Sequence, residues 1–381
     1  MIVVVGAGII GTSIADELAR RGARVHVLDM RSPGRGASQA SAGILAPYTE
    51  AHERTALLEL GTRSLAMFDD FVAGMRERSG RAIDYARTGT LEVAFTADDE
   101  SRLRASRAWL DKIGVLVEWL SASDLRAREP SVHPSARGGL FNPLHGWVGV
   151  TSLVTGLVES AKRSGVTFET PVDAAEVTPR QGGGAEVRAG DRRYEADAVV
   201  VAAGSWTGRI KVAGAPALPV RPVRGQLLHL RWPDSQPPPS RIVWSRDCYV
   251  VPWPDRSLLV GATVEDVGFD ERVTTEGVRS LADAAGALLP AAKAGEFVAA
   301  RAGLRPAAPD GLPIIGGLRG ARGVIAATAH YRNGVLLAPL TASLVAEMLL
   351  HSGGDPALEV VSPDRFLNQN GGRTPSPWTR N

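Results

Sequence analysis

A glycine-rich turn that directly follows an apolar run at residues 2–5 constrains this chain more than any other feature. In the segment GAGIIG, Gly6 allows a tight turn, Gly8 lets the backbone approach a pyrophosphate, and Gly11 lets the following helix pack on the strand. The N–H groups at the start of that helix would face the phosphates. A second strand at 24–28 ends in Asp29, placed like the acid that bonds a ribose hydroxyl about 20 residues after the glycines. The alternative is an ordinary glycine-rich turn, but strand, turn, helix, strand and acid in this order predict a dinucleotide-binding unit.

Composition limits the classes of protein that remain. A length of 381 residues predicts two domains, and 22% charged against 44% apolar residues indicates a globular chain. Acids and bases are interspersed and the net charge is +2, so nothing points to a nucleic-acid partner. A single cysteine, Cys248, excludes an internal disulfide and fits a reducing compartment. We expect a cytoplasmic protein because Met1 opens directly onto the first strand, which leaves no room for a signal peptide.

The stretch from 335 to 350 is the most apolar long segment of the chain. Pro339, Thr341, Ser343 and Glu347 interrupt it, and it is too short to span a bilayer, so we expect a helix of a soluble domain and no membrane association. The seven histidines are scattered and no Cys/His cluster has metal-ligand spacing, so we expect no metal site.

After Asp29 the chain departs from a nicotinamide dehydrogenase, which would continue with a helix and a third strand. Residues 31–47 form instead a loop rich in Gly, Ser and Ala, which lets backbone lie against a large planar ligand. Patterning then predicts further elements, which are a helix at 56–75, a hairpin at 83–95, helices at 97–113 and 151–164, a strand at 166–172, a hairpin at 186–194 and a strand at 198–202 that closes on Gly204.

From residue 220 the pattern changes to longer alternating strands, typical of an antiparallel sheet with one covered face. Strands are expected at 226–232, 242–252, 257–263 and 324–327, with helices at 278–294 and from 335. The fold class is therefore α/β, with a Rossmann-like dinucleotide-binding domain of parallel strands and a domain built on an antiparallel sheet. We expect the first domain to comprise residues 1–82, 140–215 and 300–352, the second 83–139 and 216–299, and residues 353–381 to be a flexible tail.

Four segments make a family resemblance specific, namely GAGIIG, GASQASAGIL, GLRPAAPDGLPIIG and HYRNGVLLAP. With them the chain resembles the D-amino-acid oxidase family of flavoproteins, which share a glutathione-reductase-like fold, and within it the glycine oxidases of thiamine biosynthesis. The resemblance covers residues 2 to about 350. It implies FAD, held noncovalently, because no cysteine near His330 to Gly334 could tether a flavin as in sarcosine oxidases. It also implies a homo-oligomer, a tetramer in the relatives.

The resemblance and the glycine motif together assign the cofactor site. The expected FAD-binding residues are Gly6, Gly8, Ile9, Ile10, Gly11, Asp29, Met30, Ala37, Ser38, Ala42, Gly43, Ile44, Val172, Gly204, His330, Tyr331, Arg332, Asn333, Gly334, Val335 and Leu336.

A carboxylate that enters a partly apolar pocket needs a cation, and a guanidinium can hold it with two parallel hydrogen bonds. Arg305 and Arg332 are the candidates, because both are expected in turns among apolar residues, although a surface or structural role is the alternative for each. Tyr249 matches a further substrate-contacting position; alternatively it packs in the core. Glu50 matches an acidic residue of the entrance loop, or is a solvated carboxylate.

Two positions depart from the family. Asp247 replaces a histidine and Val264 replaces a methionine, both at the border of the substrate pocket in the relatives. The smaller valine leaves more room, and Asp247 would favour a cationic substrate. The alternative is that Asp247 points to solvent or pairs with an arginine.

The implied reaction is oxidative deamination of glycine or another small amine or D-amino acid. Hydride transfer to flavin N5 gives an imine, which water hydrolyses to an oxo acid and ammonia, and dioxygen as acceptor gives hydrogen peroxide. No catalytic acid or base is required. Two alternatives remain open. A flavin dehydrogenase that passes electrons to a quinone or a partner protein would share nearly every motif, and a non-catalytic flavoprotein would not need paired arginines beside the ring.

Overall fold

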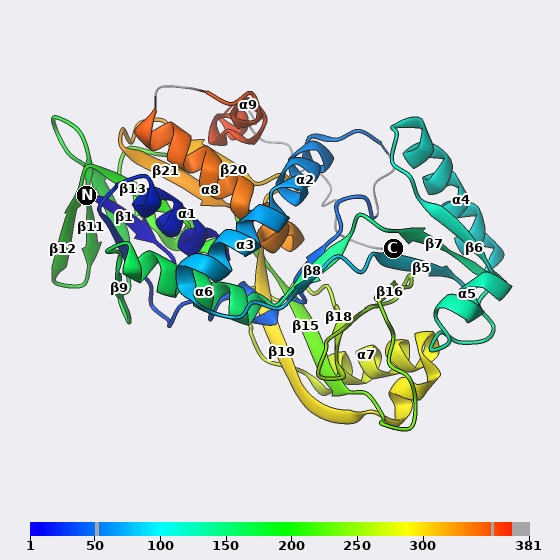
Figure 1. Cartoon of the computed structure of the whole chain (residues 1–381). Helices are drawn as coiled ribbons and strands as arrows, with labels where there is room; N and C mark the ends of the chain where they lie inside the picture. The colour runs from blue at the N-terminus through cyan, green and yellow to red at the C-terminus, as the bar shows by residue number, and fades with distance from the viewer. Residues whose placement is uncertain (50–52, 352–353, 368–381) are drawn as a thin grey trace.

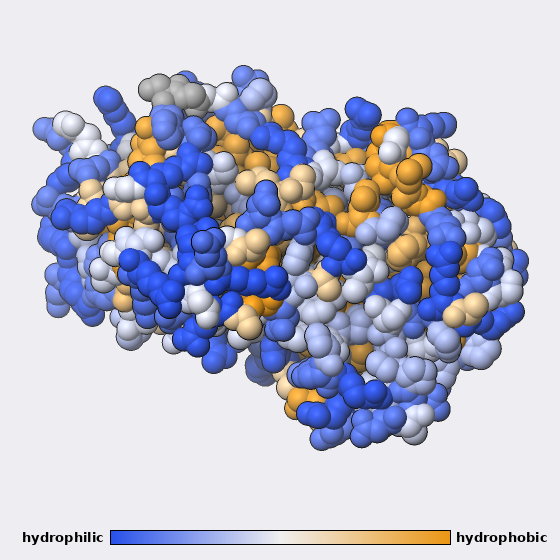
Figure 2. Space-filling view, viewed as in Figure 1, coloured by the Kyte–Doolittle hydropathy of each residue, from blue (hydrophilic) through white to orange (hydrophobic). Residues whose placement is uncertain are grey.

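The computed structural model describes residues 1–49, 53–351 and 354–367 of the chain. Glu50 and residues 368–381 lie outside the described residues. Two parts are visible in Figure 1, an α/β part that carries the N-terminus and a part built around a large sheet with α4, α5 and α7. Hydrophilic residues are spread over both parts of the face shown in Figure 2.

The α/β part contains a six-stranded sheet in the order β20-β21-β13-β1-β2-β9. Its strands are β1 Ile2–Val5, β2 Val25–Leu28, β9 Thr167–Glu169, β13 Ala198–Val201, β20 Ile314–Gly317 and β21 Val324–Thr328. All neighbours are parallel except β20 and β21. On the side away from β1, β2 pairs with β9, which comes more than a hundred residues later in the chain. The third parallel strand, which does not follow directly after Asp29 in the sequence, is thus supplied by a distant segment.

Both faces of this sheet are covered, which explains the unbroken apolar sequence of β1. Val4 faces a core shared with the helices α1 Ile9–Arg20, α6 Val150–Arg163 and α8 Gly334–Leu350. Val3 and Val5 face a second core under a four-stranded sheet. That smaller sheet consists of β10 Glu176–Pro179, β11 Ala185–Ala189, β12 Arg192–Ala196 and β14 Lys211–Val212.

The second part is built on an eight-stranded sheet in the order β19-β15-β18-β17-β16-β5-β7-β6. Its strands are β5 Thr90–Ala94, β6 Glu118–Ser121, β7 Gly138–Asn142, β15 Arg221–Arg231, β16 Ile242–Trp244, β17 Tyr249–Pro252, β18 Ser257–Gly261 and β19 Glu296–Ala307. Its helices are α4 Ala97–Lys112, α5 Ala122–Arg128 and α7 Thr275–Leu288. The long strands β15 and β19 pair from end to end and connect this sheet to the α/β part (Figure 1). A small sheet of β3 Ile44–Leu45, β8 Gly146–Val148 and β4 Tyr85–Ala86 also lies at the junction.

Several sequence-based predictions of elements were wrong. The helix expected at 56–75 is two helices, α2 Ala56–Ala66 and α3 Phe68–Ser79, which meet at Met67. The hairpin at 83–95 does not form, because β4 pairs with β8 while β5 pairs with β7 and β16. The strand at 242–252 is the hairpin of β16 and β17, and Cys248 lies buried in its turn.

The largest omission was β19, since its small and charged residues do not alternate as an amphipathic strand would. β19 spans the expected domain boundary at residue 300, and β7 spans the one at residue 140. We therefore propose domains defined by membership of the six-stranded or the eight-stranded sheet rather than by these boundaries. The flexible tail was also wrong in part, because α9 Ala357–Val361 and η5 Pro363–Phe366 fold onto the α/β part and bury Val361.

Tyr331–Leu350 is the one helical stretch in the described residues that is long and apolar enough to cross a bilayer. Most of α8 is instead buried in the α/β core, where eleven of its residues are buried. Packing inside the protein accounts for its hydrophobicity.

Candidate functional site

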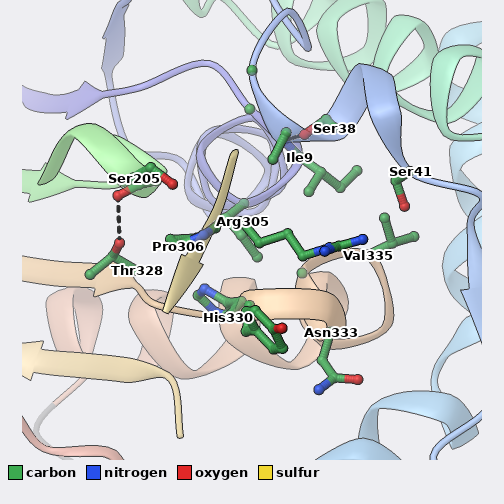
Figure 3. Close-up of a pocket in the computed structure, with 18 of the residues that line it drawn as sticks. Ile9, Ser38, Ser41, Ser205, Arg305, Pro306, Thr328, His330, Asn333 and Val335 are labelled. Carbon is green, nitrogen blue, oxygen red and sulfur yellow. Dashed lines mark hydrogen bonds between the residues drawn. The ribbon is translucent and has the colours of Figure 1, made fainter. Parts of the chain in front are cut away.

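A cavity of about 790 Å³ opens where the parallel strands of the six-stranded sheet end. Val5, Leu28 and Thr328 line it from the ends of β1, β2 and β21, and β19 lines it through residues 304–306. Figure 3 shows side chains converging on this space from α1, the loop after β2, β19 and the turn before α8. The carboxyl edge of a parallel sheet is where folds of this class bind ligands.

The glycine turn has the geometry expected of it. Gly6 has a φ of 112°, and a Cβ there would lie 2.4 Å from the Ala202 carbonyl oxygen. A Cβ on Gly11 would lie 1.9 Å from the Gly6 carbonyl oxygen. Gly11 does not line the cavity, so its role is to let α1 pack against the turn.

Asp29 lies at the end of β2 and lines the cavity. Its carboxylate accepts hydrogen bonds from the amides of Ala7 (2.6 Å) and Arg31 (2.7 Å). Burial raises the pKa of Asp29, while these amides and the Arg31 charge oppose the shift. The carboxylate is thereby fixed beside the cavity.

Two helices begin at this cavity without a hydrogen bond to the side chain of the N-cap residue, although the Ile9 amide of α1 donates to the Ser38 hydroxyl at 3.0 Å. α1 begins after Gly8 and α8 after Asn333; neither has an acidic residue in its first turn, and both first turns line the cavity. Six charged side chains among the described residues line the cavity, and four of them are cationic: Arg31, Arg209, Arg305, Arg332, Asp29 and Asp173. The N-termini of α1 and α8 and the excess of arginine favour a ligand that carries negative charge near each of these two helix N-termini.

The structure places nearly all of the predicted cofactor residues around this one cavity. Those that line it are Gly6, Gly8, Ile9, Ile10, Asp29, Met30, Ala37, Ser38, Ala42, Gly43, Ile44, Val172, Gly204, His330, Tyr331, Arg332, Asn333, Gly334, Val335 and Leu336. Gly11 is the exception.

The turn before α8 is conformationally unusual. Ala329 and Tyr331 have positive φ values of 59° and 49°, which L side chains rarely adopt. His330 between them is buried, and its Nε2 lies 3.0 Å from the Thr341 hydroxyl. Burial lowers the pKa of His330 to about 3, so its imidazole is neutral at pH 7. Strained backbone of this kind is concentrated at functional sites.

Three of the predicted substrate residues come together in the cavity wall. Arg305 and Arg332 have their Cζ atoms 6.0 and 5.7 Å from the centre of the Tyr331 ring, and Tyr249 lines the same cavity. Burial lowers the pKa of Arg305, and burial raises that of Tyr249, whose phenol is therefore protonated at pH 7. Arg332 lies in a turn as expected, but the prediction was wrong for Arg305, which lies in β19.

Asp247 and Val264 do not line the cavity. Asp247 is exposed in the turn between β16 and β17, where its amide donates to the Ser245 hydroxyl (3.4 Å), and Val264 is 44% exposed. Glu50 lies outside the described residues. The idea that Asp247 selects cationic substrates therefore has no support from this arrangement.

Sequence reasoning missed an aromatic and cationic wall. The Cζ of Arg31 lies 4.6 Å from the centre of the Trp206 ring, and its two terminal nitrogens donate to Glu271. Behind this wall, the Phe269 ring contacts both Trp206 and Arg209. The position of Trp206 just after Gly204 at a strand end was the available signal. Trp244, which packs against Tyr249 at 5.0 Å between ring centres, was also missed.

Comparison with known proteins identifies the family. Residues 1–348 match the model described as DAO, FAD dependent oxidoreductase. The chain belongs to this family. It is 33% identical over 350 residues to glycine oxidase of Geobacillus kaustophilus, which covers 91% of this chain and 92% of that one. The crystal structure of glycine oxidase from Geobacillus kaustophilus superposes with a TM-score of 0.90 over 96% of this chain and 98% of that one.

Two further relatives widen the comparison. The bifunctional protein ThiO/ThiG of Trichormus variabilis is 32% identical over 97% of this chain, which spans 55% of that longer protein. Iminodiacetate oxidase from Chelativorans sp. BNC1 superposes with a TM-score of 0.87 at 27% identity, over 95% of this chain and 99% of that one.

The chain is thus an FAD-dependent oxidoreductase of the DAO family, and its cavity fits the cofactor. The absence of a side chain at Gly8, the first turn of α1 and the carboxylate of Asp29 are suited to the pyrophosphate and ribose of a dinucleotide. The first turn of α8 also lines the cavity, and its free amides would stabilise negative charge on a bound flavin. Cys248 is buried away from the cavity, so it offers no thiol to tether the cofactor.

Proposed function

We propose that this protein catalyses FAD-dependent oxidation of a small amino acid or amine that carries a carboxylate, with glycine and related compounds as first candidates. The observation that supports it best is the placement of Arg305, Arg332 and Tyr249 on one wall of the cavity. Two guanidiniums and a protonated phenol are suited to a carboxylate.

In this proposal the residues bind and orient, and FAD, when bound, supplies hydride acceptance. Arg305 and Arg332 hold the substrate carboxylate, and the Tyr249 hydroxyl donates to it. Apolar neighbours such as Trp244 and Ile44 restrict water around the reacting carbon. His330 is neutral and its Nε2 is engaged by Thr341, so we assign it a structural role in the turn rather than proton transfer.

The deciding experiment is an anaerobic screen of glycine, sarcosine and D-amino acids with the FAD-loaded protein, with flavin absorbance as the readout. We expect at least one to bleach the flavin, and admission of air to restore the colour with formation of hydrogen peroxide and ammonia. If every compound leaves the flavin oxidised, the proposed oxidation of amines is wrong. Bleaching that air does not reverse, but that a quinone does, would favour a dehydrogenase.

Two further properties stay predictions. The single buried cysteine supports a reducing, cytoplasmic setting, and acid precipitation should release FAD into the supernatant if it is noncovalent. Light scattering after size-exclusion chromatography would test the tetramer that the family resemblance implies.

A further inference from the structure

A polar network contacts Arg305 from outside the cavity lining. Nη1 of Arg305 donates to the carbonyl oxygen of Thr263 at 2.9 Å. The Thr263 hydroxyl accepts from the amide of Gln226 (2.8 Å) and donates to Glu265. Thr263, Gln226 and Glu265 do not line the cavity, and Thr263 contacts the cavity residue Arg305 directly.

Glu265 is held from several directions. Its carboxylate accepts from Nε of Arg224 (3.1 Å) and from the side-chain amide of Gln226 (2.8 Å). Arg224 is 4% exposed and also pairs with Asp270 at 2.9 Å. Moving a guanidinium charge from water into the protein interior costs on the order of several kcal/mol. The carboxylates of Glu265 and Asp270 offset this cost for Arg224. The carboxylate that fixes Thr263 is therefore itself fixed.

Gly225 provides the floor for the guanidinium. β15 and β19 pair with Gly225 opposite Gly303, and the Arg305 side chain crosses β15 at this point. A Cβ on Gly225 would lie 2.1 to 2.5 Å from three guanidinium atoms of Arg305. A side chain at position 225 would displace the guanidinium, so the lack of a side chain at Gly225 allows the observed position of Arg305.

We propose that Glu265 and Gly225 are positioning residues for Arg305: Gly225 gives the guanidinium a flat surface, and Glu265 fixes the Thr263 carbonyl that orients it. The inference rests on the proposed function, in which Arg305 binds the substrate carboxylate. Nη1 is committed to Thr263, so the remaining N–H groups present one defined fork to the cavity. Glu265 also places a negative charge near Arg305, which opposes the lowering of the Arg305 pKa by burial.

The test uses the FAD-loaded protein and acetate, a carboxylate without an amine, titrated while the absorbance of the oxidised flavin is followed. The variants are Glu265→Gln, which keeps the shape but removes the charge, and Gly225→Ala. The control is Asp266→Asn, because Asp266 is exposed, lies in the same segment and pairs with Arg221 rather than with this network. FAD content and thermal unfolding are measured for each variant.

We expect the acetate Kd to rise at least about tenfold in Gly225→Ala and roughly three- to tenfold in Glu265→Gln, with the control within about twofold, where tenfold corresponds to about 1.4 kcal/mol. The KM for the amine substrate should follow the acetate Kd, while FAD affinity should not change. The proposal is wrong if Glu265→Gln and a folded Gly225→Ala both bind acetate with wild-type affinity. It is also wrong if acetate affinity falls only in proportion to a loss of bound FAD. If Gly225→Ala does not fold, Glu265→Gln decides. If the wild type shows no acetate response, the proposed carboxylate site is wrong and this inference falls with it.

Discussion

Replacing Arg305 by methionine tests the centre of the proposed site. Arg305 is partly buried, and within the described residues its one hydrogen bond is the 2.9 Å contact to the Thr263 carbonyl. Its other N–H groups are therefore available to a carboxylate. Hydrogen bonds to charged groups contribute about 1.5–3 kcal/mol, which predicts a roughly 10- to 150-fold weaker carboxylate affinity in Arg305→Met. Arg305→Lys should restore only part, because an ammonium lacks the planar fork.

The assay is the acetate titration of the oxidised flavin, together with kcat/KM for whichever amine bleaches it. Arg301→Met is the matched control: Arg301 lies on the same strand, does not line the cavity, and donates instead to the Gln39 carbonyl at 3.3 Å. We expect the control to bind acetate like the wild type. If Arg305→Met and Arg301→Met have the same acetate Kd while both retain FAD, Arg305 does not bind the carboxylate and the reasoning is refuted.

Three further predictions address other parts of the structure. Burial lowers the pKa of His145 to about 3, whereas the unfolded chain has the ordinary histidine pKa of about 6.5. Between these two pH values the unfolded chain binds a proton that the folded chain does not, so the free energy of unfolding should fall on acidification from pH 6.5 toward 3. The urea midpoints at pH 7 and pH 5 should therefore differ less in His145→Gln than in the wild type. Burial raises the pKa of Cys248 to about 12, so a thiol reagent at pH 8 should label one equivalent in denaturant and almost none in the folded protein; rapid labelling when folded would contradict its burial. Glu271→Gln removes the ion pair with the partly exposed Arg31, and such pairs contribute about 0–1 kcal/mol. FAD should therefore bind at most about fivefold more weakly, and the difference should shrink in high salt. A larger loss of FAD affinity, or one that does not depend on salt, would argue against a screened ion pair.

The sequence determined the features that depend on short stretches of chain. The GAGIIG turn with strand, helix and Asp29 could be predicted because the residues that form the motif lie within the first 29 positions, and Gly6 supplies the φ of 112° that the turn requires. The first strand, α1 and the helix that starts at Gly334 follow from local apolar patterns in the same way.

Only the tertiary structure decided how distant segments meet. β9 completes the sheet beside β2 from the other side of a long insertion, and β4 and β5, adjacent in sequence, join different sheets because their partners lie elsewhere. The same holds within the site. That Arg305 lies on the backbone of Gly225 and is oriented through Thr263 depends on the register of β15 and β19, and register is set by pairing across some eighty residues, which no local pattern encodes.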